Sequence, residues 1–85
     1  MNYFTYILLS EKNGDIYIGS TADIQHRVLL HNRGKVKSTK AYTPWRLLEF
    51  HEYASRSEAV KSEMFLKTGQ QKELLRKKYG QVAKW

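Results

Sequence analysis

Two strand-like runs joined by Asn13-Gly14 constrain the fold of this 85-residue chain more than any other feature. The first run, Tyr3–Leu9, is aromatic or apolar at nearly every position, as a central strand buried on both faces is. Asn and Gly both tolerate positive φ, so this pair predicts a hairpin, with Asp15–Gly19 as the returning strand. The hairpin places Tyr6 and Tyr17 on adjacent antiparallel strands, where both hydroxyls can point toward one site.

A helix is predicted directly after the hairpin. Gly19 is expected to break the returning strand, and Thr21 or Asp23 offers a side-chain oxygen that can cap a helix over residues 22–32. Gly34 suits the left-handed residue that ends many helices.

The predicted helix is amphipathic. Asp23, Arg27 and His31 follow one another at intervals of four residues, which puts them on one polar face within about 80°. The opposite, apolar side is expected to anchor the helix on the core; it carries Ile24, Val28 and Leu29, with Leu30 at its border.

The second half of the chain predicts one more strand and two helices. A polar loop over 35–43 is closed by Pro44, and residues 45–53 read as a strand of imperfect alternation. Its expected faces are Trp45, Leu47, Glu49, His51 and Tyr53 on one side, and Arg46, Leu48, Phe50 and Glu52 on the other. A capping box of Ser55 and Glu58 starts a helix that runs to Lys67 or Thr68 and stops at Gly69. The last helix, over 70–79, has Leu74 and Leu75 as its apolar stripe.

The order strand–strand–helix–strand–helix–helix predicts an α+β fold, in which a three-stranded antiparallel sheet packs with helices. The length suits one domain over residues 1–85. With 41% hydrophobic residues the chain can fold as a globule, and the lack of cysteine excludes a disulfide scaffold and a structural cysteine–zinc site. No apolar run is long enough to span a membrane, and the N-terminus lacks a signal-peptide pattern. We therefore expect a cytoplasmic protein.

The net charge of +7 favours a polyanionic partner, most often nucleic acid. The positive charge is concentrated in two segments. Residues 33–46 contain five Lys or Arg and no acid, and residues 67–84 contain six against Glu73 alone.

A phenol, a guanidinium and an imidazole around one strand–helix turn suit phosphodiester chemistry. Taken singly, each is more often a packing or solvated residue. Together, Tyr17-Ile18-Gly19, the upstream Tyr6 and the downstream Arg27 and His31 resemble the GIY-YIG nuclease superfamily. The resemblance extends to Glu63 and Lys67, covers nearly the whole chain, and is closest to the small single-domain predicted endonucleases. Where that family has Gly-Ile-Tyr, this chain has Phe4-Thr5-Tyr6, a change of strand packing that keeps the tyrosine.

The resemblance implies a metal-dependent endonuclease that hydrolyses phosphodiester bonds in DNA. It implies catalytic roles for Tyr6, Tyr17, Arg27, His31 and Glu63. Either tyrosine can be the base, and we favour Tyr17, with Tyr6 as its positioning partner. Arg27 would contact the scissile phosphate, His31 would bond a tyrosine or the phosphate, and Glu63 would be the ligand of one Mg²⁺ or Mn²⁺. Spacing alone also allows a plain ion pair between Glu63 and Lys67.

Four lysines are candidate nucleic-acid contacts: Lys35, Lys37 and Lys40 in the polar loop, and Lys67. An ordinary solvated loop is the alternative for the first three. For the whole protein the alternatives are a non-cleaving nucleic-acid-binding module and a basic protein-interaction domain, neither of which requires the five catalytic candidates. The residues leave open whether the substrate is duplex, single-stranded, branched or RNA, and they leave the oligomeric state open.

Overall fold

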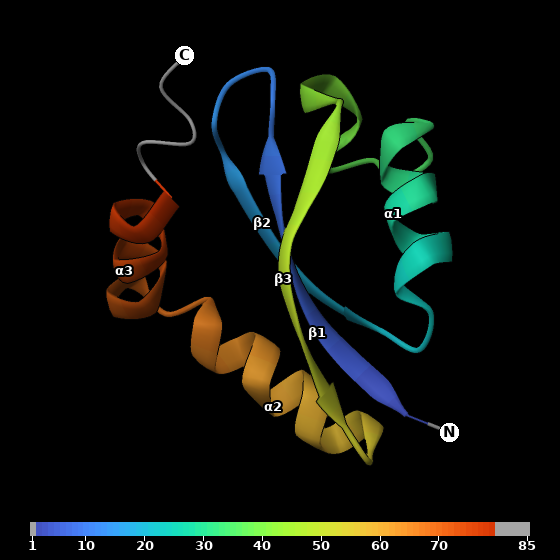
Figure 1. Cartoon of the computed structure of the whole chain (residues 1–85), viewed down its shortest axis with the longest axis vertical. Coiled ribbons are helices and arrows are strands. Elements are labelled where there is room, and N and C mark those ends of the chain that lie inside the picture. The colour runs from blue at the N-terminus through green and yellow to red at the C-terminus, as the bar shows by residue number, and fades with distance from the viewer. Residues whose placement is uncertain (1, 80–85) are drawn as a thin grey trace.

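The predicted hairpin and third strand form a three-stranded antiparallel sheet in the order β2–β1–β3. In the computed structural model, which describes residues 2–79, the strands are β1 (Tyr3–Ser10), β2 (Ile16–Thr21) and β3 (Trp45–Tyr53). Helix α1 (Ile24–Asn32) covers one face of the sheet, and α2 (Arg56–Leu66) and α3 (Gly69–Tyr79) cover the other (Figure 1). A short 3₁₀ turn, η1 (Lys40–Tyr42), precedes β3. The predicted α+β class and element order are confirmed.

The central strand β1 is buried on both faces, as its composition predicted. Tyr6 and Leu8 face α1 and pack with Trp45, whereas Ile7 faces the other helices and packs with Ile18 and Leu75. A fully buried aliphatic side chain stabilises the fold by about 1.5–3 kcal/mol. The sheet therefore has a small core on each side.

A β-bulge in β3 makes the predicted faces of this strand wrong. Leu8 pairs with Leu47 and Ile7 pairs with Glu49, so Leu48 is an extra residue on β3. An extra residue shifts the alternation by one. Trp45 and Leu47 therefore face α1, while Glu49 and the residues that alternate with it face α2 and α3.

The inward face of α1 also differs from the prediction. Asp23 caps the helix by accepting a hydrogen bond from the His26 N–H at 3.1 Å. His31, expected on the polar face, is fully buried, whereas Leu29, expected on the apolar side, is exposed. The helix turns Arg27 and His31 toward the sheet, because polar partners for them lie there.

The C-terminal end of α1 is closed by Gly34, which has φ +72° as predicted. The N–H groups of Gly34 and Lys35 donate to the carbonyls of His31 and Leu30, the two bonds of a Schellman motif. This turn directs the following loop back toward the sheet. The side chain of Asn32 then bonds the backbone of Trp45 at both N–H and C=O, which fixes α1 against the start of β3.

The two remaining helices are anchored by caps and polar contacts. Ser55 caps α2 as predicted. Gly69 belongs to α3 instead of ending α2, and Leu75 is buried in α3 while Leu74 is exposed.

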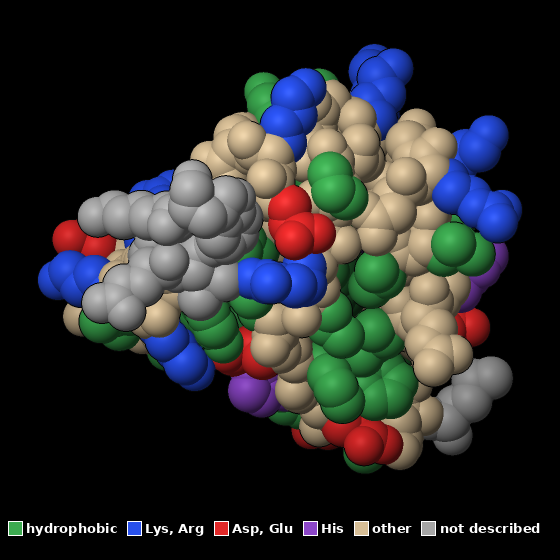
Figure 2. Space-filling model, turned by 45° about the horizontal axis from the view of Figure 1, so that its top comes forward, with side chains coloured by type: hydrophobic (Ala, Val, Ile, Leu, Met, Phe, Trp, Pro, Cys, Tyr) green, Lys and Arg blue, Asp and Glu red, His purple; other side chains and the backbone are tan. Residues whose placement is uncertain are grey.

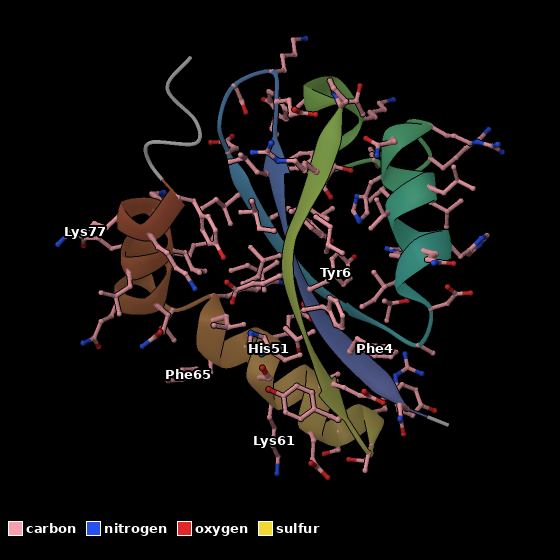
Figure 3. The ribbon with its side chains drawn as sticks, viewed as in Figure 1. Phe4, Tyr6, His51, Lys61, Phe65 and Lys77 are labelled. Atoms are coloured by element: carbon pink, nitrogen blue, oxygen red, sulfur yellow. The ribbon has the colours of Figure 1, made fainter. Side chains whose placement is uncertain are left out.

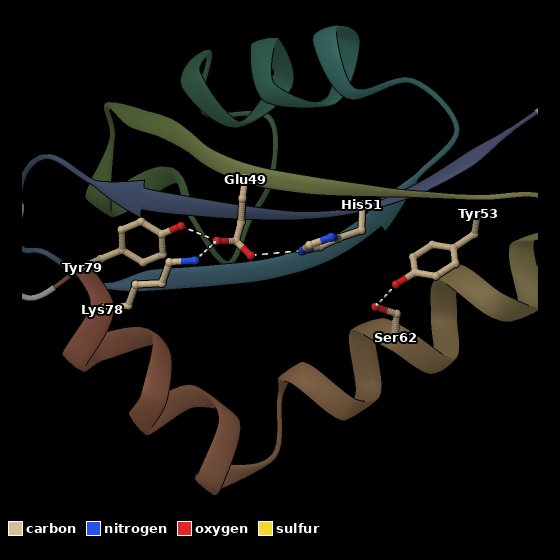
Figure 4. A network of polar contacts seen from close by, with 6 residues as sticks. All are labelled: Glu49, His51, Tyr53, Ser62, Lys78 and Tyr79. Atoms are coloured by element: carbon tan, nitrogen blue, oxygen red, sulfur yellow. Dashed lines mark hydrogen bonds and ion pairs between the residues drawn. The ribbon is translucent and has the colours of Figure 1, made fainter.

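Glu49 of β3 accepts hydrogen bonds from Tyr79 and Lys78 and contacts His51, and Tyr53 donates to Ser62 (Figure 4). These contacts hold α3 and α2 on their side of the sheet. Among residues 2–79, no helix combines the length and the apolar character that crossing a membrane requires.

Candidate active site

The candidate site is built over Gly19. This glycine was expected to break the strand, but it lies inside β2. Gly19 pairs with Tyr6 across the sheet, and a Cβ at position 19 would lie 2.6 Å from the Tyr6 hydroxyl oxygen. Gly19 does not have positive φ. Glycine is needed here because the Tyr6 side chain occupies the space that a side chain at position 19 would fill.

Tyr6 and Tyr17 come together on the α1 side of the sheet, as the hairpin predicted. Their ring centroids are 6.2 Å apart, and the His31 ring lies 4.8 Å from Tyr17 and 5.8 Å from Tyr6. Figure 3 shows Tyr6 projecting from β1 toward α1.

A buried polar chain holds the Tyr6 hydroxyl. It lies 3.0 Å from His31 Nε2, and His31 Nδ1 lies 2.7 Å from Thr39 Oγ1. Because Thr39 Oγ1 donates to the Val36 carbonyl, it accepts from His31 Nδ1–H, and Nε2 then accepts from Tyr6. Both ring nitrogens of His31 are thus occupied within the protein.

Burial determines the charge states of His31 and Tyr6 in this hydrogen-bonded network. It lowers the pKa of His31 to about 4, and the positive charge of Arg27 acts in the same direction. Burial also raises the pKa of Tyr6 to about 12, although contact with Arg27 opposes the shift. At neutral pH the imidazole is therefore neutral and the Tyr6 phenol is protonated.

Arg27 is the cation of the site. Contact with the Tyr6 hydroxyl raises the pKa of Arg27 above its ordinary value, and Tyr17 adds to this effect by a contact of its own. A permanently charged, planar group beside two hydroxyls is suited to bind phosphate oxygens in pairs.

Glu63 lies on α2 and reaches the edge strand β2. Its Oε1 accepts a hydrogen bond from Ser20 Oγ at 2.7 Å, and its Oε2 accepts one from Lys67 Nζ, also at 2.7 Å. Partial burial acts to raise the pKa of Glu63, but the bonds from Lys67 and Ser20 outweigh it and hold the pKa below its ordinary value. The carboxylate is therefore ionised, and the ion pair that spacing allowed is present.

This carboxylate has the chemistry of a ligand for a hard divalent ion. Mg²⁺ keeps most of its waters and often takes only one or two protein carboxylates. Within residues 2–79 there is no cluster of three or more His, Cys, Asp or Glu that could hold a metal. Glu63 fits the ion as a single ligand, with Lys67 competing for one of its oxygens.

A pocket of about 360 Å³ opens beside these groups at the end of β2. It is lined by residues of both flanking helices and of the strand ends: Tyr3, Ser20, Thr21, Ala22, Arg27, Arg56 and Ala59. Arg56 was missed in the sequence because nothing in its spacing separates it from a solvated helix residue. We call this the cationic pocket.

The loop lysines lie apart from this pocket. Lys35 and Lys37 follow the C-terminal end of α1 and Lys40 begins η1, whereas the pocket uses residues before and early in α1. Nine helical residues span about 13 Å. Thr39 of the same loop is buried against His31, a role that no local sequence pattern signals.

Comparison with known proteins places this chain in one family. The model of the GIY-YIG catalytic domain matches residues 2–79. A UPF0213 protein of Streptococcus pneumoniae is 38% identical over 69 residues, covering 79% of this chain and 70% of that protein. One from Staphylococcus aureus is 37% identical over 76 residues, covering 88% and 92%.

A solved structure agrees. The solution NMR structure of a UPF0213 protein from Bacillus halodurans matches with a TM-score of 0.53 and 36% identity, covering 88% of this chain and 82% of that one. The chain therefore belongs to the GIY-YIG catalytic-domain family, alongside the small UPF0213 proteins.

Proposed function

We propose that this protein is a metal-dependent endonuclease that hydrolyses phosphodiester bonds in DNA. One observation supports it most: Arg27 contacts the hydroxyls of both tyrosines, and one of these is held by the buried chain through His31 to Thr39. A surface that only bound nucleic acid would need cations, but it would not need a buried imidazole orienting a phenol beside one of them.

In this proposal Arg27 binds the scissile phosphate and Tyr17 takes a proton from the attacking water. To act as a base Tyr17 must be a phenolate, and the Arg27 guanidinium contacts its oxygen. Tyr6 remains a protonated donor to His31, so its role is to position Arg27 and the water. His31 acts through Tyr6, since it is buried and both its nitrogens are taken.

Glu63 is the residue that would hold Mg²⁺ or Mn²⁺, and Ser20 would orient it. Such an ion, when bound, supplies positive charge that stabilises the transition state at phosphorus. Lys67, which pairs with one oxygen of Glu63, would then be available to a phosphate. This exchange of partners is easy because the ion pair is partly exposed, and such pairs contribute only about 0–1 kcal/mol.

The loop lysines Lys35, Lys37 and Lys40 provide a second contact region about one helix length from the cationic pocket. A DNA backbone lying along α1 would meet both. We also propose the cytoplasm as the compartment and one domain for the stretch of chain described.

A non-cleaving nucleic-acid-binding module is the second candidate. It is favoured by one observation, that both oxygens of Glu63 already have partners in the protein. In that case Glu63 would link α2 to β2 without binding a metal.

Cleavage assays separate the two candidates. Labelled duplex, single-stranded and branched DNA, RNA, and closed circular DNA would be incubated with Mg²⁺, Mn²⁺ or EDTA. The nuclease is expected to cut at least one DNA, circles included, only with a metal. Binding whose log K falls with log[salt] at a slope near −4 to −5, for about five phosphate contacts, but without cleavage of any substrate, would favour the module.

A further inference from the structure

A second pocket, of about 390 Å³ and mostly apolar, lies next to the cationic pocket. It is lined by residues of the central strand β1, of the edge strand β3, and of the start of α1 with the two residues before it: Phe4, Ala22, Asp23, Ile24, Gln25, Leu47 and Phe50. Ala22 lines both pockets. The two are also linked through the sheet, since Phe4 pairs with Thr21, which lines the cationic pocket. We call this second one the aromatic pocket.

The bulge in β3 is what builds the aromatic pocket. Because Leu48 is an extra residue, Phe50 pairs with Tyr6 and faces the α1 side together with Phe4. The Phe4 and Phe50 rings meet edge to face, with centroids 6.1 Å apart and planes at 73°. Phe4 lies on the Tyr6 side of the sheet in Figure 3.

Phe50 is one of several large hydrophobic residues that the fold leaves exposed. Phe50 is 53% exposed, although Tyr6, its pairing partner on β1, is buried. Figure 2 shows hydrophobic side chains gathered in a patch on the visible face of the molecule. An exposed aromatic group beside a charged pocket is typical of a binding surface.

The cationic pocket has the opposite chemistry. Arg27 and Arg56 reach it from different helices, and no carboxylate is among its lining residues within the part of the chain described. The Arg56 side chain makes no hydrogen bond or ion pair with any residue from 2 to 79. Two guanidiniums without an acid form a site for an anion with several oxygens.

We propose that the two pockets form one nucleotide subsite, with an unstacked nucleobase on Phe4 and Phe50 and its phosphate between Arg27 and Arg56. This proposal rests on the proposed function and names the form of substrate that the site takes. A flat apolar base and a charged phosphate are joined through one sugar, which matches two pockets of opposite polarity that share one wall. Asp23 and Gln25 at the rim offer polar atoms to the edge of a base.

The occupant follows from this match. A base inside a duplex has both faces covered by its neighbours and cannot enter an aromatic pocket without leaving the stack. The subsite therefore favours single-stranded DNA or a duplex with an unpaired nucleotide at the cut. Because every base has a π-face, the contact tolerates any sequence.

The test compares Phe50→Ala with Phe65→Ala, a control that removes an equally exposed phenylalanine from α2. Binding of a labelled single-stranded oligonucleotide would be measured in EDTA, so that no cleavage interferes. Losing one base–aromatic stack should weaken the binding of Phe50→Ala by roughly 5- to 140-fold. Phe65→Ala should bind as the wild type does, and Phe50→Trp should restore affinity.

An oligonucleotide in which abasic sites replace the bases separates stacking from misfolding. On this probe the wild type and Phe50→Ala should bind equally, because no base is present to stack. Arg56→Gln, in contrast, should weaken both probes alike and reduce the salt slope by about one.

Several outcomes would overturn the subsite. One is unchanged binding of Phe50→Ala; another is an equal loss on the normal and abasic probes. A wild-type dimer that Phe50→Ala converts to a monomer, with DNA binding unaffected, would assign the patch to a second copy of the chain. If no DNA is cleaved with either metal but the Phe50 effect remains, the proposed nuclease fails and the subsite stands. If DNA is cleaved but Phe50→Ala binds the oligonucleotide as the wild type does, the nuclease stands and the subsite fails.

Discussion

Replacing Gly19 with alanine tests why the site needs glycine at this position. The new Cβ would lie 2.6 Å from the Tyr6 hydroxyl oxygen, 2.7 Å from its Cζ and 3.1 Å from Cε2 of Tyr17. Real Cβ contacts are essentially never shorter than 3.0 Å, so Tyr6 must move. It is the fully buried end of a hydrogen-bonded chain and has little room to do so.

The expected destabilisation is about 3 kcal/mol. Inserting a methyl group into a packed core costs about 1–3 kcal/mol. Moving the Tyr6 hydroxyl off His31 leaves a buried acceptor without a partner, which costs about 1–3 kcal/mol more. Alanine in a strand recovers about 0.5–1 kcal/mol relative to glycine.

Urea unfolding of Gly19→Ala and Gly69→Ala measures this effect. A Cβ at position 69 would meet nothing within 4 Å, so that control should be neutral or stabilised by up to about 1 kcal/mol. Adding Tyr6→Phe should make the alanine at position 19 less destabilising, because the closest atom is gone. A Gly19→Ala protein as stable as the wild type would refute the packing argument.

Three further predictions concern the buried imidazole, the guanidinium and the loop. The pKa of His31 is about 4 in the fold and 6.5 in the unfolded state, so the unfolded state binds more protons between these pH values. The free energy of unfolding should therefore fall by about 3 kcal/mol as pH drops from 6.5 to 4. This pH dependence of unfolding should disappear in His31→Gln and remain in His26→Gln. Arg27→Lys should stay folded yet lose most cleavage in a single-turnover assay, because lysine lacks the planar pair of donors; near-wild-type rates would make Arg27 a generic cation. Exchanging the loop cations Lys35, Lys37 and Lys40 together for glutamine should lower the DNA affinity and the salt slope without changing the unfolding midpoint. An unchanged Kd of this triple variant would move the binding surface to another part of the protein.

The elements and the two tyrosines could be predicted because local patterns determine them. Asn13-Gly14 and the apolar run before it sufficed for the hairpin, and Asp23 and Gly34 marked the ends of α1. Adjacent antiparallel strands bring residues such as Tyr6 and Tyr17 together by register alone.

The interior of the site depends on contacts between distant segments and could not be predicted. The spacing of apolar residues in α1 predicts that Leu29 points inward, but Leu29 is exposed in the fold. His31 is buried instead, because it forms hydrogen bonds with Tyr6 and Thr39. The side chain that needs the space over Gly19 comes from the neighbouring strand.

The position of the bulge in β3 could not be predicted either, because it also depends on a contact between distant segments. An imperfect alternation signals an irregular strand but does not say which residue is extra. Only the pairing with β1 identifies Leu48, and with it the face on which Phe50 lies.

The central claim, that Glu63 holds a catalytic metal, has one direct test: the single-turnover cleavage rate of Glu63→Gln in Mg²⁺, compared with Glu73→Gln. Both variants neutralise a glutamate paired with a lysine four residues later, and Glu73 lies on α3. A neutral amide is a poor ligand for a hard ion, so Glu63→Gln should cleave slower by orders of magnitude, with metal-free DNA binding unchanged or slightly tighter, and Glu73→Gln should cleave normally. A Glu63→Gln protein that cleaves at the wild-type rate would contradict the account.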